Sequence, residues 1–154
     1  MSRPSSTTAA AAVVPETACW RVLVVDDDAG VLAITRAALR GLVVEGRPLA
    51  MTGVHSAAEA VKWLSAHSDP AVLLVDMRLE NASGGAEIVR MARHTLGHAH
   101  VRVLMRSGVP ADQVLAQVVD LDVSGVLGKC DVSLQDLRAA VVAAVTEFAG
   151  LQRG

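Results

Sequence analysis

The sequence predicts an α/β fold, a doubly wound (βα)5 sandwich with a five-stranded parallel sheet. Two observations support this prediction. Apolar runs without polar alternation, such as Val22–Val25 and Val72–Val75, are typical of strands that are buried on both faces of a parallel sheet. Segments with the spacing of amphipathic helices alternate with these runs along the chain. Strands that alternate with helices pair in parallel and are covered on both faces, which gives the expected architecture.

The first half of the chain is expected to form two strand–helix pairs and a third strand. In order, the elements are strand Arg21–Val25, helix Ala29–Leu42, strand Leu49–Val54, helix Ser56–Ala66 and strand Val72–Val75. The first helix has one apolar face, formed by Val31, Ile34, Ala38 and Leu42. The second helix opens on a capping box, because Ser56 is followed three residues later by Glu59. Asp69 and Pro70 then end this helix.

The second half is expected to complete the five pairs. In order, the elements are helix Ala86–Leu96 after a loop at Asn81–Gly85, strand Val101–Met105, helix Pro110–Asp120, strand Val123–Leu127 and helix Ser133–Phe148. Pro110 suits the first turn of its helix, and Ser133 is a typical N-cap residue. The apolar stripe expected on the buried side of the last helix consists of Leu134, Leu137, Val141, Val145 and Phe148.

The composition indicates one domain with a sizeable core. With 154 residues, we expect a disordered leader at residues 1–19, a folded domain at 20–150 and a short tail at 151–154. The net charge of -2 does not indicate a nucleic-acid-binding surface. The longest stretch without Asp, Glu, Lys or Arg, Pro4–Pro15, is too short to span a membrane. The chain has only two cysteines, which fits the reducing cytoplasm better than a disulfide framework.

Carboxylates follow two of the predicted strands. Asp26 and Asp27 come directly after the first strand, and Asp76 comes directly after the third. Because ligands of open α/β sheets bind beyond the carboxyl ends of the strands, we expect these side chains to meet in one pocket. Crowded carboxylates raise one another's pKa unless a cation is present, so the pocket is expected to bind Mg²⁺. Simpler roles remain open, because Asp26–Asp28 would also cap the first helix and Asp76 would also suit an ordinary turn.

Two more polar residues follow later strands, Ser107 after the fourth and Lys129 after the fifth. With these residues the chain, from residue 20 to residue 150, resembles the receiver domain of bacterial two-component response regulators, a flavodoxin-like domain. The resemblance implies that Asp76 accepts a phosphoryl group, that Ser107 hydrogen-bonds to this group and that Lys129 pairs with it. It also implies a magnesium site whose ligands are Asp26, Asp27, Asp76 and the backbone carbonyl of Arg78.

The same resemblance implies a function in signal transduction. A histidine kinase or phosphotransfer protein would phosphorylate Asp76, and the domain would relay the signal to a downstream protein effector in the cytoplasm. The only catalysis expected is that of its own phosphorylation and dephosphorylation. The fourth helix, fifth strand and fifth helix form the expected partner or homodimer surface. On the last helix, a small and largely apolar strip consists of Ala139, Val142, Ala143 and Thr146.

Two other functions are consistent with parts of the sequence. One is a pseudo-receiver, a binding module that is never phosphorylated. Unusual residues at Val126 and Cys130 favour this reading, whereas the complete set of acidic and basic residues opposes it. The other is a small phosphatase with an aspartate nucleophile. Such enzymes commonly carry a second aspartate two residues after the nucleophile, and here Arg78 occupies that position after Asp76.

Three positions differ from the pattern of typical receivers. Glu80 stands where a proline is usual, four residues after the acceptor. Val126 replaces an aromatic residue, and a β-branched side chain cannot swing as a ring does, so any switch must be read differently. Cys130 replaces the proline after Lys129. A cis bond before a residue other than proline costs about 2.5–4 kcal/mol, so we expect the Lys129–Cys130 bond to be trans.

Other segments are similar to one receiver subgroup, which is found ahead of longer signalling domains that include cyclic-dinucleotide phosphodiesterases. The similar segments are Gly46-Arg47, the loop around Glu80, Arg106–Gly108 and Lys129 before a small polar residue. Three histidines, at His94, His98 and His100, lack the spacing of a common metal site. We therefore expect these histidines to be solvated loop residues.

Overall fold

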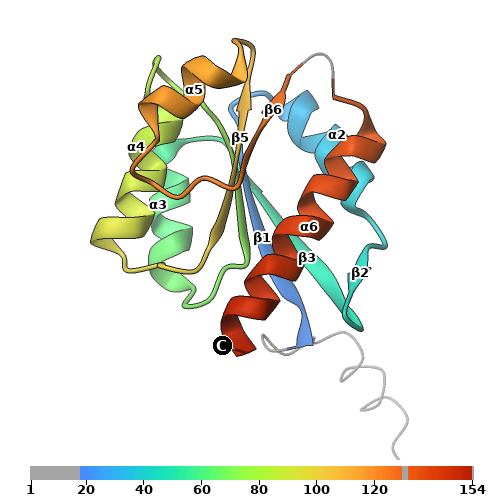
Figure 1. Ribbon diagram of the computed structural model, residues 1–154. Helices are drawn as coiled ribbons and strands as arrows, with labels where there is room; N and C mark the ends of the chain where they lie inside the picture. Colours follow the sequence, from blue (N-terminus) through green and yellow to red (C-terminus); the bar gives the residue numbers. More distant parts are fainter. Residues whose placement is uncertain (1–17, 130–131, 154) are drawn as a thin grey trace, which may run out of the picture.

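A six-stranded sheet forms the centre of the molecule (Figure 1). The computed structural model describes residues 18–129 and 132–153. The strands are β1 (Trp20–Val25), β2 (Val43–Val44), β3 (Arg47–Val54), β4 (Val72–Asp76), β5 (Arg102–Ser107) and β6 (Gly125–Gly128). Their order is β2-β3-β1-β4-β5-β6, and all neighbours pair in parallel except β2 and β3. The doubly wound α/β prediction is confirmed, with one additional antiparallel strand.

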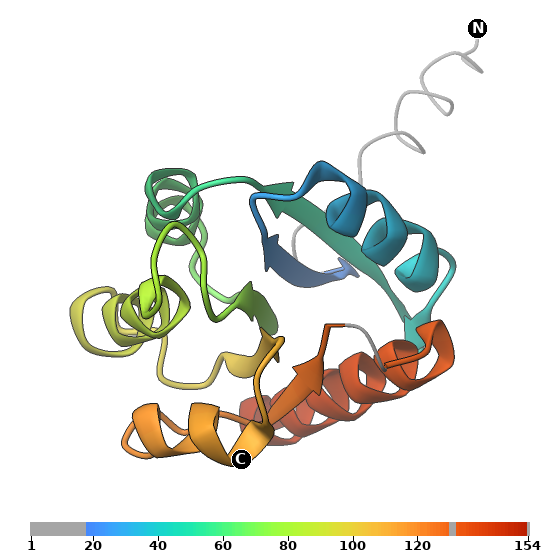
Figure 2. The same ribbon diagram turned by 90° about the horizontal axis from the view of Figure 1, so that it is seen from above.

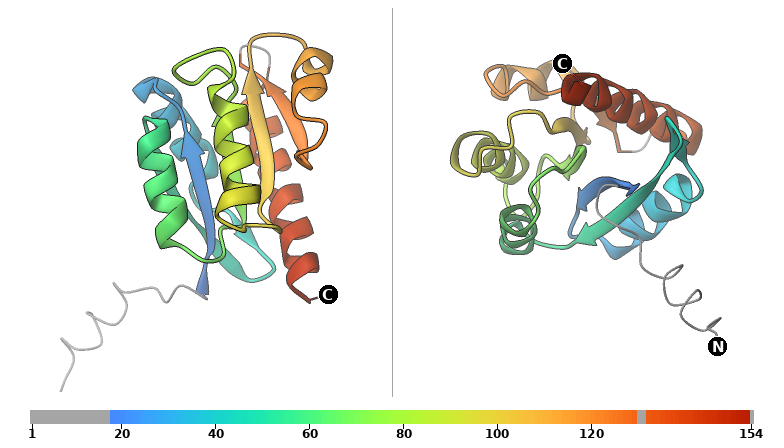
Figure 3. Two further views of the ribbon diagram at one scale, coloured as in Figure 1. Left: turned by 90° about the vertical axis from the view of Figure 1, so that its left-hand side faces the viewer. Right: turned by 90° about the horizontal axis from the view of Figure 1, so that it is seen from below.

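Helices cover both faces of this sheet. They are α2 (Ala29–Leu39), α3 (Ala57–Ala66), α4 (Gly84–Arg90), its π-helical continuation η2 (Met91–Thr95), α5 (Ala111–Gln117) and α6 (Leu134–Arg153). The helices α3, α4 and α5 lie on one face, whereas α2 and α6 lie on the other (Figure 2 and Figure 3). Among the described residues, no helix is long and apolar enough to span a membrane.

The central strands β1 and β4 contribute side chains to two separate hydrophobic layers. Leu23 and Val75 pack beneath α3, α4 and α5, whereas Val24 and Leu74 pack beneath α2 and α6. These four side chains are almost completely buried. Successive residues of a strand point to opposite faces, so a strand between two helical layers needs apolar residues at every position. This requirement explains the uninterrupted apolar runs in the sequence.

The short strand β2 is an addition to the predicted fold. It pairs with β3 across a two-residue turn, in which Glu45 and Gly46 have φ angles of 50° and 77°. A tight type I′ hairpin turn requires positive φ at both central residues. Glycine adopts this conformation readily but glutamate does so rarely, which weakens the sequence signal for the turn. The preceding helix ends at Leu39, because the chain turns into the hairpin before it reaches Leu42.

The buried face of α2 differs from the predicted one. Its buried residues are Leu32, Thr35, Ala38 and Leu39. Ile34, which was predicted to be buried, is 54% exposed. The hydroxyl of Thr35 donates a hydrogen bond of 2.8 Å to the carbonyl of Val31, which allows this polar side chain to be buried. In a helix with apolar residues on several sides, spacing alone did not identify the buried side.

The predicted N-caps of two helices are confirmed. The Ser56 hydroxyl accepts a hydrogen bond of 3.1 Å from the Glu59 N–H at the start of α3. The Glu59 carboxylate in turn accepts one of 2.7 Å from the N–H of His55, one residue before the expected partner. At the start of α6, the Ser133 hydroxyl accepts a hydrogen bond of 3.0 Å from the Asp136 N–H. Both helices begin where their sequence signals predict.

The last helix is longer than predicted. It continues to Arg153, so residues 151–153 are helical and do not form a separate tail. Four members of its predicted stripe are buried, namely Leu137, Val141, Val145 and Phe148. Leu134 is 51% exposed because it lies in the first turn, beyond the edge of the core. Val142, which was expected on the outer side, packs against the core and is half-buried.

Other predicted boundaries shift by a few residues. The helix α4 begins at Gly84, before Ala86, and passes into η2 at Met91, while α5 ends at Gln117. Most of the expected leader lies outside the described residues, and Cys19 is buried directly before β1.

One of the three histidines that were expected to be solvated is buried. His98 is 9% exposed, and its Nε2 lies 2.7 Å from the carbonyl oxygen of Leu64, so it belongs to the interior. 

Candidate functional site

Two buried carboxylates lie side by side at the carboxyl end of the sheet. The strands β1 and β4 are neighbours, and their register pairs Val25 with Val75. Asp26 directly follows β1 and Asp76 is the last residue of β4, so the fold places their side chains at the same edge. Asp26 is completely buried, and Asp76 is 3% exposed. The predicted juxtaposition of these strand ends is therefore present.

Asp27 completes a group of three carboxylates. One oxygen from each of Asp26, Asp27 and Asp76 lies within 4.8 Å of the other two. Asp27 is exposed, so the group opens towards solvent on one side. Within the described residues, this is the only group of three or more potential metal-ligating side chains, and the histidines do not form another.

The environment of Asp26 fits a bound cation. Its Oδ1 accepts a hydrogen bond of 2.9 Å from the Asp28 N–H, but its buried Oδ2 has no hydrogen-bond partner among the described residues. Burial raises the pKa of Asp26, and the nearby charges of Asp76 and Asp27 raise it further. A hard divalent cation would satisfy the unpaired oxygen and relieve the repulsion. The residues present therefore fit Mg²⁺.

Lys129 joins the site from the end of β6. Its ammonium group donates a hydrogen bond of 2.8 Å to Oδ2 of Asp76. The N–H of Lys129 donates to the carbonyl of Ser107 at 2.9 Å, which fixes the direction of the chain as it leaves the sheet. Partial burial acts to lower the pKa of Lys129, but the hydrogen bond and the charge of Asp76 raise it overall. The lysine is therefore held in its charged form beside Asp76.

The loop after Asp76 packs tightly against the end of β4. The N–H of Arg78 donates a hydrogen bond of 3.1 Å to Oδ1 of Asp76. Further along, the N–H of Gly85 donates to the carbonyl of Met77 at 3.0 Å. A Cβ atom at Gly85 would lie 2.4 Å from the carbonyl oxygen of Asp76, so only glycine fits there. The start of α4 can therefore approach the backbone at the end of β4 closely.

Ser107 lies at the end of β5 and is 2% exposed. Its hydroxyl interacts with its own loop: it donates to the carbonyl of Val109 at 3.1 Å and accepts from the N–H of Val109 at 3.0 Å. Both bonds are local, so the hydroxyl can be redirected without disturbing the sheet. The role predicted for Arg78, as a ligand of Mg²⁺, involves its backbone carbonyl and not its side chain. The Lys129–Cys130 bond, which was predicted to be trans, lies outside the described residues.

Two polar contacts near the site were not predicted from the sequence. Glu80 has a φ angle of 65°, and its carboxylate accepts a hydrogen bond of 3.0 Å from the N–H of Ala57 at the start of α3. The only sequence signal at this position was that Glu80 stands where typical receivers carry a proline. On β5, the Arg106 side chain donates to the Thr35 hydroxyl of α2 at 2.8 Å, while its buried Nε has no partner among the described residues.

Comparisons with known proteins agree with this geometry. A family model described as the response regulator receiver domain matches residues 22–142. A relative from Vibrio cholerae, a 3'3'-cGAMP-specific phosphodiesterase 2, is 33% identical over 136 residues, which are 86% of this chain and 26% of the relative. The chain thus spans about a quarter of that relative's length.

Solved structures show the same fold. The signal receiver domain of an HD domain-containing protein from Pseudomonas fluorescens Pf-5 matches with a TM-score of 0.73 and 17% identity, over 92% of this chain and 97% of that one. A response regulator protein from Burkholderia pseudomallei, solved with a phosphorylated aspartic acid, a calcium ion and citrate, matches with a TM-score of 0.62 and 22% identity. The match covers 87% of this chain and 71% of that one.

Proposed function

This chain belongs to the response regulator receiver domain family, and we propose that Asp76 accepts a phosphoryl group from a histidine kinase or a phosphotransfer protein. The observation that carries the proposal is the pairing of Asp76 with Lys129 at 2.8 Å, beside two further carboxylates. An aspartate in this setting is an oxygen nucleophile with a cation at its side. Such carboxylates form acyl phosphates in other enzymes.

The proposed transfer is a displacement at phosphorus. An oxygen of Asp76 forms a bond to phosphorus as the bond between phosphorus and the donor's histidine nitrogen breaks. Lys129 stabilises the negative charge on the transferred oxygens, because its ammonium group already lies against Asp76. In such reactions the protein contributes mainly by positioning groups and stabilising charge.

We propose that Mg²⁺ occupies the acidic group of Asp26, Asp27 and Asp76, together with the carbonyl of Arg78. When bound, the ion would neutralise charge on the phosphoryl oxygens and orient them. Asp26 and Asp27 serve to hold this cation, while Asp28 caps α2 by accepting hydrogen bonds of 2.8 and 3.3 Å from the Gly30 and Val31 N–H groups. Asp26 and Asp27 would therefore bind the metal, whereas their neighbour Asp28 stabilises the helix.

The relay step would use Ser107. Phosphorylation changes the charge at Asp76 from one negative charge to nearly two and adds acceptor oxygens. The Ser107 hydroxyl, now bonded to Val109, would turn to donate to one of these oxygens and would move the loop after β5. Partner proteins would read this change at α5, β6 and α6. Val126, which packs partly buried against the core in β6, is too stiff to report it by a change of rotamer.

We propose no catalytic activity beyond self-phosphorylation and self-dephosphorylation. The phosphorylated aspartic acid in the Burkholderia pseudomallei protein supports the modification of this fold at an aspartate. A pseudo-receiver would keep the fold but would not be phosphorylated. Arg78, two residues after Asp76, disfavours the phosphatase alternative, since it cannot act as a carboxylic acid.

Intact mass spectrometry after incubation with acetyl phosphate and Mg²⁺ tests the proposal. We expect the chain to gain the mass of one phosphoryl group, and Asp76→Asn to abolish this gain. Asp28→Asn is the matched control, because asparagine also caps a helix and the variant should be phosphorylated normally. Equal labelling of Asp76→Asn would refute the acceptor assignment, and an unlabelled wild-type chain would favour the pseudo-receiver.

A further inference from the structure

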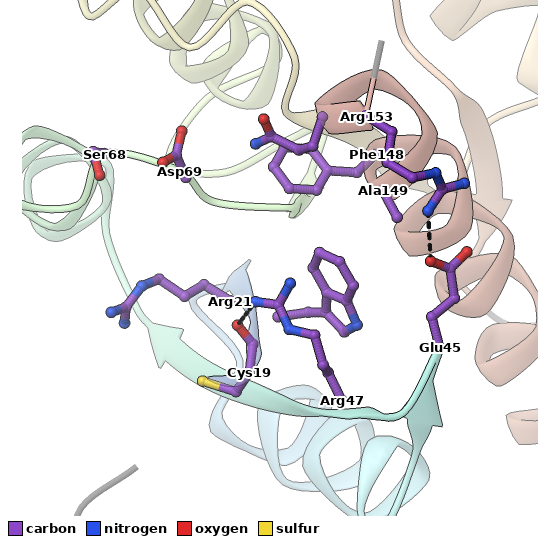
Figure 4. A pocket seen from close by; sticks show the side chains of 11 residues that line it. Cys19, Arg21, Glu45, Arg47, Ser68, Asp69, Phe148, Ala149 and Arg153 are labelled. Carbon is purple, nitrogen blue, oxygen red and sulfur yellow. Dashed lines mark hydrogen bonds and ion pairs between the residues drawn. The ribbon is translucent and has the colours of Figure 1, made fainter. Parts of the chain in front are cut away.

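Side-chain contacts connect separate parts of the chain at both ends of the sheet. At the end opposite to Asp76, Arg153 pairs with Glu45 at 2.8 Å (Figure 4). Beside this pair, Arg47 donates a hydrogen bond of 3.0 Å to the carbonyl of Cys19. These contacts connect the β2–β3 hairpin with α6 and with the start of β1. At the end that carries Asp76, a contact of the same kind holds a loop of the candidate site.

Glu80 makes this contact from the loop between β4 and α4. Its carboxylate accepts a hydrogen bond of 3.0 Å from the N–H of Ala57, the first residue of α3. The first N–H groups of a helix have no partner within it, and the helix dipole favours a carboxylate beside them. The helix is a rigid support, because its residues Ala60 and Leu64 are buried in the core. The loop is therefore held against an element that is itself fixed.

The backbone at Glu80 is strained. Its φ angle is 65°, and the N–H of Asn81 donates to the carbonyl of Leu79 at 2.7 Å. A positive φ at the residue that such a bond spans is typical of the rare, strained type of γ-turn. Strained conformations persist only where surrounding contacts enforce them, and they cluster at functional sites. Here the contact with Ala57 and the complete burial of Leu79 enforce the turn.

The same loop carries backbone groups of the candidate site. The N–H of Arg78 donates a hydrogen bond of 3.1 Å to Oδ1 of Asp76. Glu80 follows two residues after Arg78 and is bound to the start of α3. The backbone of Arg78 therefore lies between two fixed points, one at the carboxylate of Asp76 and one at the helix. Its conformation depends on both contacts.

We propose that Glu80 is a positioning residue of the site, which holds the backbone of Arg78 in the conformation that binds the divalent cation. It acts through its hydrogen bond to Ala57 and not through its charge. This inference rests on the function proposed above, in which the carbonyl of Arg78 is a ligand of Mg²⁺. Loss of a residue that orients a metal ligand commonly weakens metal binding about 10–100-fold.

Calorimetric titration of the metal-free protein with Mg²⁺ tests the proposal. Glu80→Ala removes the carboxylate but retains a Cβ atom, so the strained turn loses its support. We expect the Kd of this variant for Mg²⁺ to rise about tenfold. Glu80→Gln removes the charge but retains a side-chain oxygen that accepts hydrogen bonds, so its Kd should stay within about threefold of the wild-type value.

Two variants of α3 separate this contact from the stability of the helix. Ala57→Pro removes the N–H that Glu80 binds, and proline suits the first position of a helix. It should reproduce the increase in Kd without any change in the loop sequence. Ser56→Ala is the matched control, because it removes the hydroxyl that accepts from the Glu59 N–H in the same helical turn. It should lower Tm but leave the Kd for Mg²⁺ unchanged.

Hydrogen exchange provides a measurement that needs no metal. In the metal-free protein, the N–H of Arg78 should exchange at least about threefold faster in Glu80→Ala and Ala57→Pro than in the wild type. The reason is that the bond from this N–H to Asp76 loses the support of the second contact. Ser56→Ala should leave the exchange rate unchanged.

The outcomes are distinct. If the wild type binds Mg²⁺ and the Kd is unchanged in Glu80→Ala or in Ala57→Pro, the positioning role is refuted while the proposed function stands. Equal weakening in Glu80→Gln and Glu80→Ala would assign the effect to charge, and equal weakening in Ser56→Ala would assign it to helix stability. Either result would overturn the inference. A wild-type chain that binds no Mg²⁺ would overturn the proposed metal site and this inference with it.

Discussion

The ammonium group of Lys129 lies 2.8 Å from Oδ2 of Asp76, although the two residues follow strands that are separated by β5. The lysine therefore reaches across the end of one strand to contact the carboxylate. Its backbone is held at the same time by the bond from its N–H to Ser107. Because both ends of the side chain are fixed, the cation is already positioned for charge that develops beside Asp76.

Replacement of this lysine should slow phosphorylation strongly. For Lys129→Gln we expect the rate of labelling by acetyl phosphate to fall about a hundredfold, as for the removal of a positioned charge donor in other active sites. Time-resolved intact mass spectrometry measures the rate. Lys62 is the other lysine of the chain and is exposed on α3, so Lys62→Gln should react at the wild-type rate. An unchanged rate in Lys129→Gln would remove the lysine from the proposed mechanism.

The pKa of Asp26 predicts how stability depends on pH. Burial raises this pKa above the usual 3.8, so the folded state binds the proton more tightly than the unfolded chain does. Ionisation of Asp26 therefore destabilises the fold. The contribution of Asp26 to stability is greatest below pH 3.8 and is lost as the pH rises through the raised value.

Asp26→Asn should accordingly stabilise the metal-free protein at neutral pH. Each kcal/mol gained corresponds to an increase in Tm of about 2–4 °C for a domain of this size. Thermal unfolding in the presence of a chelator, at neutral and at acidic pH, measures the effect, which should shrink as the pH falls. Asp120→Asn, at an exposed position, should leave Tm unchanged. A lower Tm for Asp26→Asn at neutral pH would contradict the destabilisation assigned to the buried charge of Asp26.

Magnesium should stabilise the chain through the same carboxylates. A ligand that binds only the folded state raises the free energy of unfolding by about 2.7 kcal/mol at a hundredfold excess over its Kd. Thermal unfolding with Mg²⁺, followed by a chelator, should show a reversible increase in Tm. Asp27→Asn should reduce the increase, and Asp112→Asn in α5 should retain it. An equal response in Asp27→Asn would place the ion elsewhere.

A methyl group at Gly85 should disrupt the base of the site. In Gly85→Ala the new Cβ would lie 2.4 Å from the carbonyl oxygen of Asp76 and 2.8 Å from Cα of Met77. Such overpacking costs about 1–3 kcal/mol, which denaturant unfolding would detect. Gly150→Ala is the matched control with the opposite sign, because its Cβ meets nothing within 4 Å and alanine favours the helix by about 0.5–1 kcal/mol. Similar stabilities of the two variants would contradict the close approach.

The expected partner surface can be tested on α5. Leu115 is 45% exposed on this helix, and Ala143 and Thr146 are exposed on α6. If phosphorylated chains associate through this surface, Leu115→Lys should prevent the increase in molecular mass seen by light scattering after phosphorylation. Ile34→Lys introduces the same charge at a 54% exposed position on α2 and should have no effect. The reverse pattern would move the interface to α2.

The sequence predicted which polar side chains lie together better than it predicted the edges of the fold. Asp26, Asp76 and Lys129 could be expected at the same edge because parallel strands all end there, whereas the distances between their side chains depend on the strand order β1-β4-β5-β6. The hairpin β2–β3 could not be foreseen, since its turn contains Glu45 with a positive φ. The cap that Glu80 provides for α3 depends on a contact between segments 23 residues apart, which no local pattern reveals.

The strand β2 also affects how the molecule behaves when it is crowded. Without it, the eight-residue strand β3 would expose a long row of unpaired N–H and C=O groups at the edge of the sheet. With it, Arg47 and Pro48 at the start of β3 pair with β2, so the free edge of this strand shortens to its last six residues. The opposite edge of the sheet is β6, which has only four residues. A foreign strand would therefore find fewer groups to pair with than on a sheet that lacks β2, and the hairpin lowers the risk of edge-to-edge aggregation.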